Sequence, residues 1–153
     1  YTRIFSVLLM DTHEELKVWL RAYINAKSQT GLDVLDTQYD SGGFDVYVKL
    51  KDKEQFFLIK SNFDIKSIEK AIPFDKPTYL VVPNRHEVLG EVLSHWDTLV
   101  GYPKLCILFV NPGAPYERKW QLYPATHDRL IGRKNLKSAL LSLFSQVPEY
   151  INK

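Results

Sequence analysis

The sequence contains little cysteine, no long apolar run and almost no net charge. Its single cysteine, Cys106, leaves no partner for a disulfide within the chain and favours a reducing compartment, so we expect a cytoplasmic, intracellular protein. No apolar stretch approaches the length of a membrane span and no signal peptide is visible, so we expect no membrane partner. The 153 residues are enough to bury one core without disulfides, and we expect a single domain over residues 1–153.

The net charge and the absence of several catalytic motifs limit the kinds of site that we expect in this protein. A net charge of +2 permits nucleic-acid binding without requiring it. The four histidines show no metal-ligand spacing, so no zinc site is expected. Gly42-Gly43 lacks the helix and lysine of a phosphate loop, and no serine lies in a nucleophile elbow. We interpret His127, next to Asp128, as a loop histidine bonded to nearby backbone.

Hydrophobic periodicity predicts the order of helices and strands. Asp11 or Thr12 is the expected N-cap of the first helix, Asp64 that of the second and Asn135 that of the last. An apolar run at 4–10 is either a strand or the start of the first helix. We expect helices at about 12–27, 65–72, 87–96 and from Asn135 to before Pro148, and strands at 32–39, 44–50, 56–60, 78–82, 104–110 and 119–123.

This order predicts an α/β fold with a mixed central sheet. The first three strands alternate polar and apolar residues and resemble a meander of hairpins. The strands at 78–82 and 104–110 are wholly apolar and each follows a helix, so they are expected in the centre of the sheet, covered on both faces. The expected architecture is an α/β sandwich.

Asp45 and Lys60 are the leading candidates for a catalytic site. Asp45 follows Gly42-Gly43 at the start of one apolar strand, and Lys60 ends the next. Because adjacent antiparallel strands can place both residues on one face, the pair can meet at an edge of the sheet. An acid and a lysine in this arrangement are the minimal residue pair of a metal-dependent phosphodiesterase site. An ordinary charged hairpin has the same pattern.

The Gly-Gly-Phe-Asp turn, the strand ending in Lys60 and the element order resemble the PD-(D/E)XK superfamily over about residues 12–82. The resemblance implies a three-layer, restriction-endonuclease-like sandwich and a nuclease that uses Mg²⁺ or Mn²⁺. It also implies that Asp45 is a metal ligand, that Lys60 is catalytic and that a glutamate of the first helix supports them. Glu15 is the nearest match for that glutamate, with Glu14 as the alternative.

One position departs from the pattern of this superfamily. The family has an acid two residues before the lysine, where this chain has Leu58. Since Mg²⁺ prefers several oxygen ligands, Asp45 alone would bind it weakly. Glu69 or Asp64 in the following helix can supply the missing ligand, and Glu69 is the residue that we predict as the second metal ligand and as part of the catalytic site. A catalytically inactive descendant, with no cofactor, fits the sequence equally well.

Basic residues interleaved with aromatics form a second candidate site. Arg129, Arg133 and Lys134 are predicted to contact a phosphate backbone while Trp120 or Tyr116 stacks on a base. The alternative is a solvated loop next to a helix.

Two functions remain compatible with the sequence. The first is a nucleic-acid-handling, nuclease-like domain, with DNA preferred over RNA. The second is a non-catalytic accessory or protein-interaction subunit, in which a protein partner or a homodimer contacts an apolar patch around Tyr116, Trp120 and Tyr123. A partner chain can also complete the catalytic site.

Overall fold

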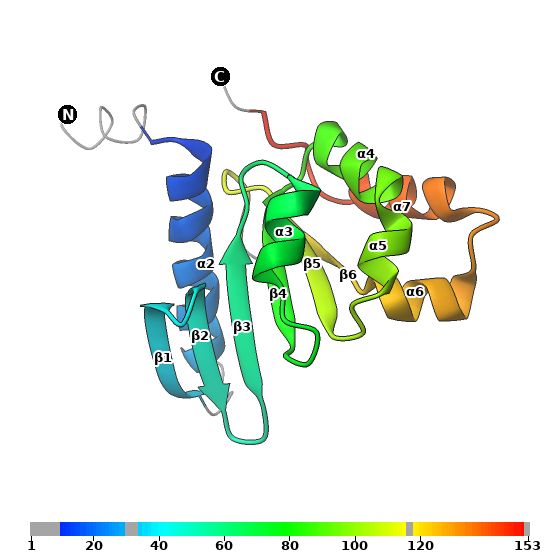
Figure 1. Cartoon of the computed structure of the whole chain (residues 1–153). Coiled ribbons are helices and arrows are strands. Elements are labelled where there is room, and N and C mark those ends of the chain that lie inside the picture. The colour runs from blue at the N-terminus through cyan, green and yellow to red at the C-terminus, as the bar shows by residue number, and fades with distance from the viewer. Residues whose placement is uncertain (1–9, 30–33, 116–117, 152–153) are drawn as a thin grey trace.

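The computed structural model describes residues 10–29, 34–115 and 118–151, which form six helices and six strands (Figure 1). The helices are α2 (Thr12–Gln29), α3 (Ile65–Ala71), α4 (His86–Ser94), α5 (Trp96–Val100), α6 (Pro124–Ile131) and α7 (Leu136–Phe144). The strands are β1 (Val34–Ser41), β2 (Phe44–Leu50), β3 (Glu54–Ile59), β4 (Thr78–Pro83), β5 (Leu105–Val110) and β6 (Lys119–Leu122).

All six strands pair in chain order to form one mixed sheet. β1, β2 and β3 are an antiparallel meander, β4 and β5 run parallel to β3, and β6 is antiparallel to β5. The two wholly apolar strands, β4 and β5, are therefore interior, as the sequence predicted. Their burial on both faces explains the unbroken apolar composition.

Helices cover both faces of the sheet and make three layers. Among the described helices, α2 is the one on the first face, and its Leu16 and Leu20 are completely buried in a core with side chains of β2, β3, β4 and β5. On the other face α3, α4, α5 and α7 surround a larger core that includes Leu58 and Phe109. Figure 1 shows α2 and α3 on opposite sides of β3. The α/β sandwich is confirmed at this level.

Local chemistry sets the ends of the elements near the site. Asp11 caps α2, because its Oδ1 accepts a hydrogen bond of 2.8 Å from the main-chain N–H of Glu14. Gly42 and Gly43 have φ values of +63° and +84°, a conformation that glycine adopts at low cost, and this turn places Asp45 at the start of β2.

Three predictions about local structure are wrong. The expected helix at 87–96 is divided into α4 and α5, since His95 leaves the helical conformation between them. His127 lies in α6 rather than in a loop, because Pro124 begins a helix at its first position instead of only ending a strand. Asn135 precedes α7 but makes no side-chain cap.

Two expectations fall outside the described residues: the apolar run before Met10 and the role of Tyr116. Within the described ranges, no helix has the length and apolar composition needed to cross a membrane.

Candidate functional site

Asp45 bonds to the main chain of the neighbouring strand. Val46 pairs with Phe57, so Asp45 lies next to Leu58, on the side of the sheet that α3 covers. Its Oδ2 accepts a hydrogen bond of 2.7 Å from the N–H of Ile59. The carboxylate thus satisfies a main-chain donor at the end of β3, which is a structural role.

Lys60 also directs its side chain into the fold. Its main-chain N–H donates to Val81 of β4 at 2.9 Å, and its Nζ donates to Ser67 Oγ of α3 at 3.0 Å. Asp45 and Lys60 therefore lie at the same end and on the same side of the sheet. The Asp45 carboxylate bonds to the N–H of Ile59, and the Lys60 ammonium bonds to Ser67.

The other predicted acids do not join them. Glu69 is exposed and lies two residues after Ser67, the helix residue that Lys60 contacts. Two residues of an α-helix correspond to a rotation of about 200°, so Glu69 and Ser67 lie on nearly opposite sides of α3. Asp64 caps α3 by accepting from the N–H of Lys66. Glu15 belongs to α2, on the other face of the sheet, where it accepts a hydrogen bond from the Tyr150 hydroxyl.

No three histidine, cysteine, aspartate or glutamate side chains gather as a metal site anywhere in the part of the chain that the structure describes. The sequence predicted Asp45 and Glu69 as metal ligands, with Asp64 as the alternative to Glu69, and two carboxylates alone are a poor site for an ion that prefers octahedral oxygen ligation. Among the described residues, Asp45 therefore does not belong to a group of three such ligands.

The predicted basic site is partly neutralised. Arg133 donates from Nε to Asp128 Oδ1 at 2.9 Å and also pairs with Asp97. The hydrogen bond from Arg133, followed by that from Trp96, lowers the pKa of Asp128 below its usual value. Arg129 lies in the last turn of α6 and Lys134 follows that helix, and both are exposed.

Trp120 cannot stack on a base. Its side chain is 5% exposed, its ring stacks on Phe109 with centroids 4.0 Å apart, and its Nε1 donates to Asn84 Oδ1 at 2.8 Å. The prediction of base stacking is wrong, because the apolar strand pattern around Trp120 places the ring in the core.

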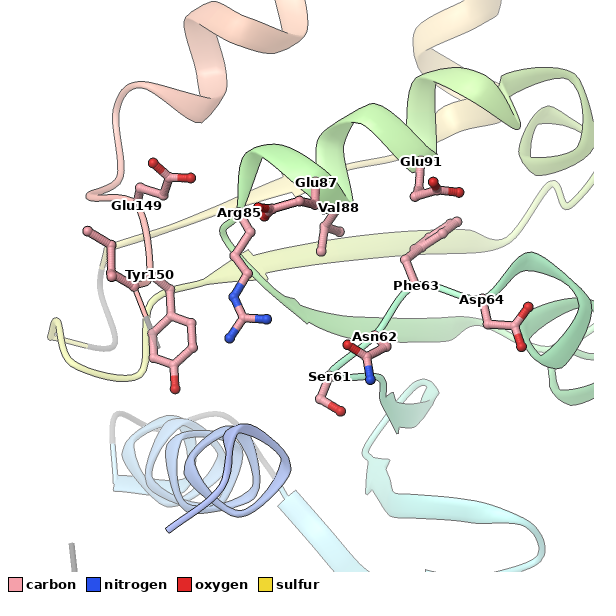
Figure 2. Close-up of a pocket in the computed structure, with 11 residues that line it drawn as sticks. Ser61, Asn62, Phe63, Asp64, Arg85, Glu87, Val88, Glu91, Glu149 and Tyr150 are labelled. Atoms are coloured by element: carbon pink, nitrogen blue, oxygen red, sulfur yellow. The ribbon is translucent and has the colours of Figure 1, made fainter. Parts of the chain in front are cut away.

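A groove instead opens where the parallel strands β3 and β4 end. Ligands of open α/β sheets commonly bind at this edge. A smaller hollow of about 280 Å³, called the inner hollow below, and a larger one of about 760 Å³, called the outer hollow, share Ser61, Asn62 and Arg85. Figure 2 shows the residues that line the outer hollow. The inner hollow is completed by Asp11, Thr12 and His13, and the outer one by Phe63, Asp64, Glu87, Val88, Glu91, Glu149, Tyr150 and Ile151.

Arg85 is the central cation of this groove. Its Nη2 donates to Thr12 Oγ1 at 3.1 Å, and its Cζ lies 4.9 Å from the ring centroid of Tyr150. Among the described residues it has no ion pair with a carboxylate. Figure 2 shows the guanidinium between Tyr150 and the segment of Ser61 and Asn62. A half-buried guanidinium held in this way can donate to an anion.

Most carboxylates of the outer hollow have partners within the fold. Glu149 accepts from the main-chain N–H of His86 at 3.2 Å, and Glu91 lies 3.4 Å from His95 Nε2. Asp64 is the cap of α3. The inner hollow has hydroxyl, amide and guanidinium donors, and its one carboxylate, Asp11, already accepts the hydrogen bond from the N–H of Glu14. It is thus the part of the groove that suits a phosphate oxygen.

No family model, no curated protein and no solved structure matches this chain. The functional argument therefore rests on the groove and on the residues around Asp45.

Arg85, Ser61 and Asn62 were not predicted as site residues from the sequence. The available signal was position: Ser61 and Asn62 follow β3, and Arg85 comes two residues after β4, so all three come directly after parallel strands. A polar residue at the carboxyl end of such a strand is a candidate for ligand binding whether or not it belongs to a known motif.

Proposed function

We propose that this chain is a restriction-endonuclease-like domain that binds nucleic acid without cleaving it. The proposal of a lost activity is supported by Leu58 in place of an acid and by the bond between the Asp45 carboxylate and the main chain of β3. The proposal of binding depends on one observation: Arg85 lies beside the neutral groups of Thr12, Ser61 and Asn62 and, among the described residues, forms no ion pair with any of the carboxylates that line the groove.

The groove would hold one phosphate group of the backbone. Arg85 donates two hydrogen bonds to phosphate oxygens, while Thr12 and the Tyr150 ring keep its side chain in place. Ser61 and Asn62 add neutral hydrogen bonds from the other side of the hollow. Because the contact neutralises a phosphate and releases counterions, affinity must fall as salt rises.

The test compares Arg85→Gln with Arg129→Gln, which removes one exposed arginine of the basic site that the sequence predicted on α6, so the two candidate binding sites are compared directly. Fluorescence anisotropy with labelled single-stranded and duplex DNA and RNA, at two salt concentrations, measures binding, and added Mg²⁺ or Mn²⁺ tests cleavage. A charged hydrogen bond contributes about 1.5–3 kcal/mol, so Arg85→Gln should weaken binding by about ten- to a hundredfold. Arg129→Gln should have a much smaller effect.

Three results would contradict the proposal. Wild-type protein that binds no DNA or RNA form has no such function. Cleavage that disappears in Asp45→Ala and Lys60→Ala would establish an active nuclease. Equal loss of affinity in the two arginine variants would show that the main phosphate contact does not lie in the groove.

A second candidate, a protein-interaction module, is favoured by the surface on the other side of Tyr150. There a hollow of about 790 Å³ lies between α2 and the segment after β5, with Val18 57% exposed and Ile151 79% exposed at its wall. If this surface joins two copies of the chain, sedimentation should show a concentration-dependent dimer that Val18→Lys abolishes. Of the patch predicted from the sequence, Trp120 is buried and Tyr123 is 42% exposed.

A further inference from the structure

The two hollows of the groove differ in charge. The outer hollow is lined by four exposed carboxylates, those of Asp64, Glu87, Glu91 and Glu149. Arg85 is the only arginine or lysine among the described residues that line it. The inner hollow has the same arginine and one carboxylate, Asp11, which caps α2. A phosphate is therefore favoured in the inner hollow and repelled by most of the outer one.

The direction of the Arg85 side chain agrees with this division. Figure 2 shows its guanidinium directed away from α4, the helix that carries Glu87 and Glu91. The hydrogen bond of 3.1 Å from its Nη2 to Thr12 Oγ1 holds the group at the first turn of α2, which lines the inner hollow. Because the two hollows share residues, a ligand with its phosphate in the inner hollow can extend into the outer one.

The outer hollow suits a nucleoside better than a second phosphate. Its volume of about 760 Å³ lies in the range of pockets that hold small ligands. The half-buried ring of Phe63 and the buried side chain of Val88 give it an apolar wall against which a base can pack. Glu87 has no ion pair with any described residue, so its carboxylate can accept from an amino group of the base or a hydroxyl of the sugar.

We propose that the groove binds a single terminal phosphate, a phosphomonoester joined to a nucleoside, with the phosphate in the inner hollow and the nucleoside in the outer hollow. This inference rests on the proposed function and deepens it, because it assigns the groove to the end of a strand rather than to its interior. A free nucleoside monophosphate has the same chemistry, and the experiment below distinguishes it from a strand end.

The walls of the groove favour an end over an internal phosphate. A strand that continues in both directions from the phosphate meets the first turn of α2 on one side and the carboxylates of the outer hollow on the other. A strand end continues in one direction only. Its phosphate also carries a charge of about −1.5 to −2 at pH 7, more than the single charge of an internal phosphate, and this strengthens its hydrogen bonds to Arg85.

The test compares short strands, each with a fluorescent label on an internal base, that differ only in their ends. They carry a 5′-phosphate, a 3′-phosphate or hydroxyls at both ends, and a hydroxyl-ended strand about two nucleotides longer matches the charge of the terminal phosphate. Fluorescence anisotropy should show one phosphorylated strand binding at least about tenfold more tightly than both hydroxyl-ended strands. Preference for either phosphorylated end supports the inference and identifies that end.

Variants test the roles of Arg85 and of the carboxylates. Arg85→Gln should remove the preference. Glu87→Gln with Glu91→Gln should strengthen the binding of hydroxyl-ended strands by about three- to tenfold, since it removes charges that repel a second phosphate. The matched variant, Asp52→Asn with Asp75→Asn, loses two exposed carboxylates that precede β3 and β4, at the opposite end of the sheet, and should change binding less than about twofold. Both double variants change surface residues, so they test the inference even if Arg85→Gln is unstable.

The outcomes separate this inference from the proposed function. Equal affinity for the phosphorylated strands and the hydroxyl-ended strand of matched charge, with Arg85→Gln defective on all of them, would overturn the terminal-phosphate site and leave the function standing. A preference that persists in Arg85→Gln would also overturn the site. If the wild type binds no strand, the proposed function fails, and adenosine 5′-monophosphate becomes the probe. Isothermal titration that shows binding, weakened at least about tenfold in Arg85→Gln, would support the site, and absent or unchanged binding would overturn it.

Discussion

Two polar regions lie at the same end of the sheet and use their charges differently. Where β2 begins and β3 ends, Asp45 bonds to the Ile59 N–H and Lys60 bonds to Ser67, so both charged groups have partners inside the fold. Two residues after the end of β4, Arg85 has a hydroxyl and a ring beside it and faces an open groove. The first region has the residue types of a catalytic motif, and the second has donors that are available to a ligand.

This difference shows why residue identity is a weaker guide than hydrogen-bond partners. A carboxylate that satisfies a main-chain donor stabilises the fold and has less capacity left for a metal ion. A buried polar group with complete partners should affect unfolding when it is replaced, whereas a groove residue should affect binding. The following variants test this distinction.

The largest loss of stability is expected for Asn84→Ala, next to Arg85 in the chain. Asn84 is fully buried, and its side chain accepts from Trp120 Nε1 and donates to the carbonyl of Val147 at 3.1 Å. Its removal leaves a buried donor and a buried acceptor without partners, at about 1–3 kcal/mol each. Urea unfolding should show a loss of about 3–5 kcal/mol, while the exposed Asn25→Ala should stay within about 0.5 kcal/mol.

Asn84→Ala also tests whether the groove depends on its buried support. The main-chain carbonyl of Asn84 accepts from the Tyr150 N–H, and Tyr150 packs on the Arg85 guanidinium. A variant that unfolds no more easily than wild type would show that this hydrogen-bond network contributes little, and the distinction between the two regions would lose its main support.

Asp45→Ala should have the next largest effect, and on stability rather than on binding. The variant leaves the N–H of Ile59, a residue 4% exposed, without its acceptor, so urea unfolding should show a loss of about 2 kcal/mol. Asp45→Asn keeps an amide oxygen that can accept and should lose less than half of this. If Asp45→Ala keeps its stability and loses nucleic-acid affinity or cleavage, the Asp45 carboxylate takes part in ligand binding or catalysis.

The fold was predictable from the sequence to a greater extent than the site. Apolar strands and the caps at Asp11 and Asp64 are local signals, so all six strands and the starts of α2 and α3 were predicted to within about two residues. The partner of Asp45 was not predictable, because it depends on where the main-chain pairing of β2 and β3 ends in space. Trp120 was misplaced for the same reason: its neighbours Phe109 and Asn84 are distant in the chain. Pro124 shows a further ambiguity, since proline both ends strands and begins helices.

Tyr150→Phe distinguishes the contribution of the Tyr150 ring from that of its hydroxyl to the position of the Arg85 side chain. The hydroxyl donates to Glu15, and burial, followed by this hydrogen bond, raises the pKa of Tyr150 above its ordinary value of 10. Loss of the hydroxyl should cost about 1 kcal/mol at pH 7. A raised pKa means that the stabilisation is complete below pH 10 and is lost as the pH rises further, so the two unfolding curves should converge above pH 10.

Nucleic-acid affinity should survive in Tyr150→Phe, because the phenyl ring still packs on the guanidinium. Affinity that falls as far as in Arg85→Gln would show that the hydroxyl, and not the ring, positions the arginine. A gap between the two unfolding curves that stays constant to about pH 11 would contradict the contribution of the raised pKa.

The smallest effect is expected for Lys60, the residue that the motif would make catalytic. Lys60→Met keeps the aliphatic part of the side chain and removes one hydrogen bond to Ser67, which is partly exposed, so the free energy of unfolding should fall by no more than about 0.5–1 kcal/mol. Ser67→Ala removes the same bond from the other side and should match it, and the double variant should lose no more than either single variant. Affinity measured by anisotropy should equal that of wild type in all three, because Nζ is directed to α3. Reduced affinity in Lys60→Met but not in Ser67→Ala would mean that the lysine leaves Ser67 to reach a phosphate, and the motif region would then belong to the binding site together with Arg85.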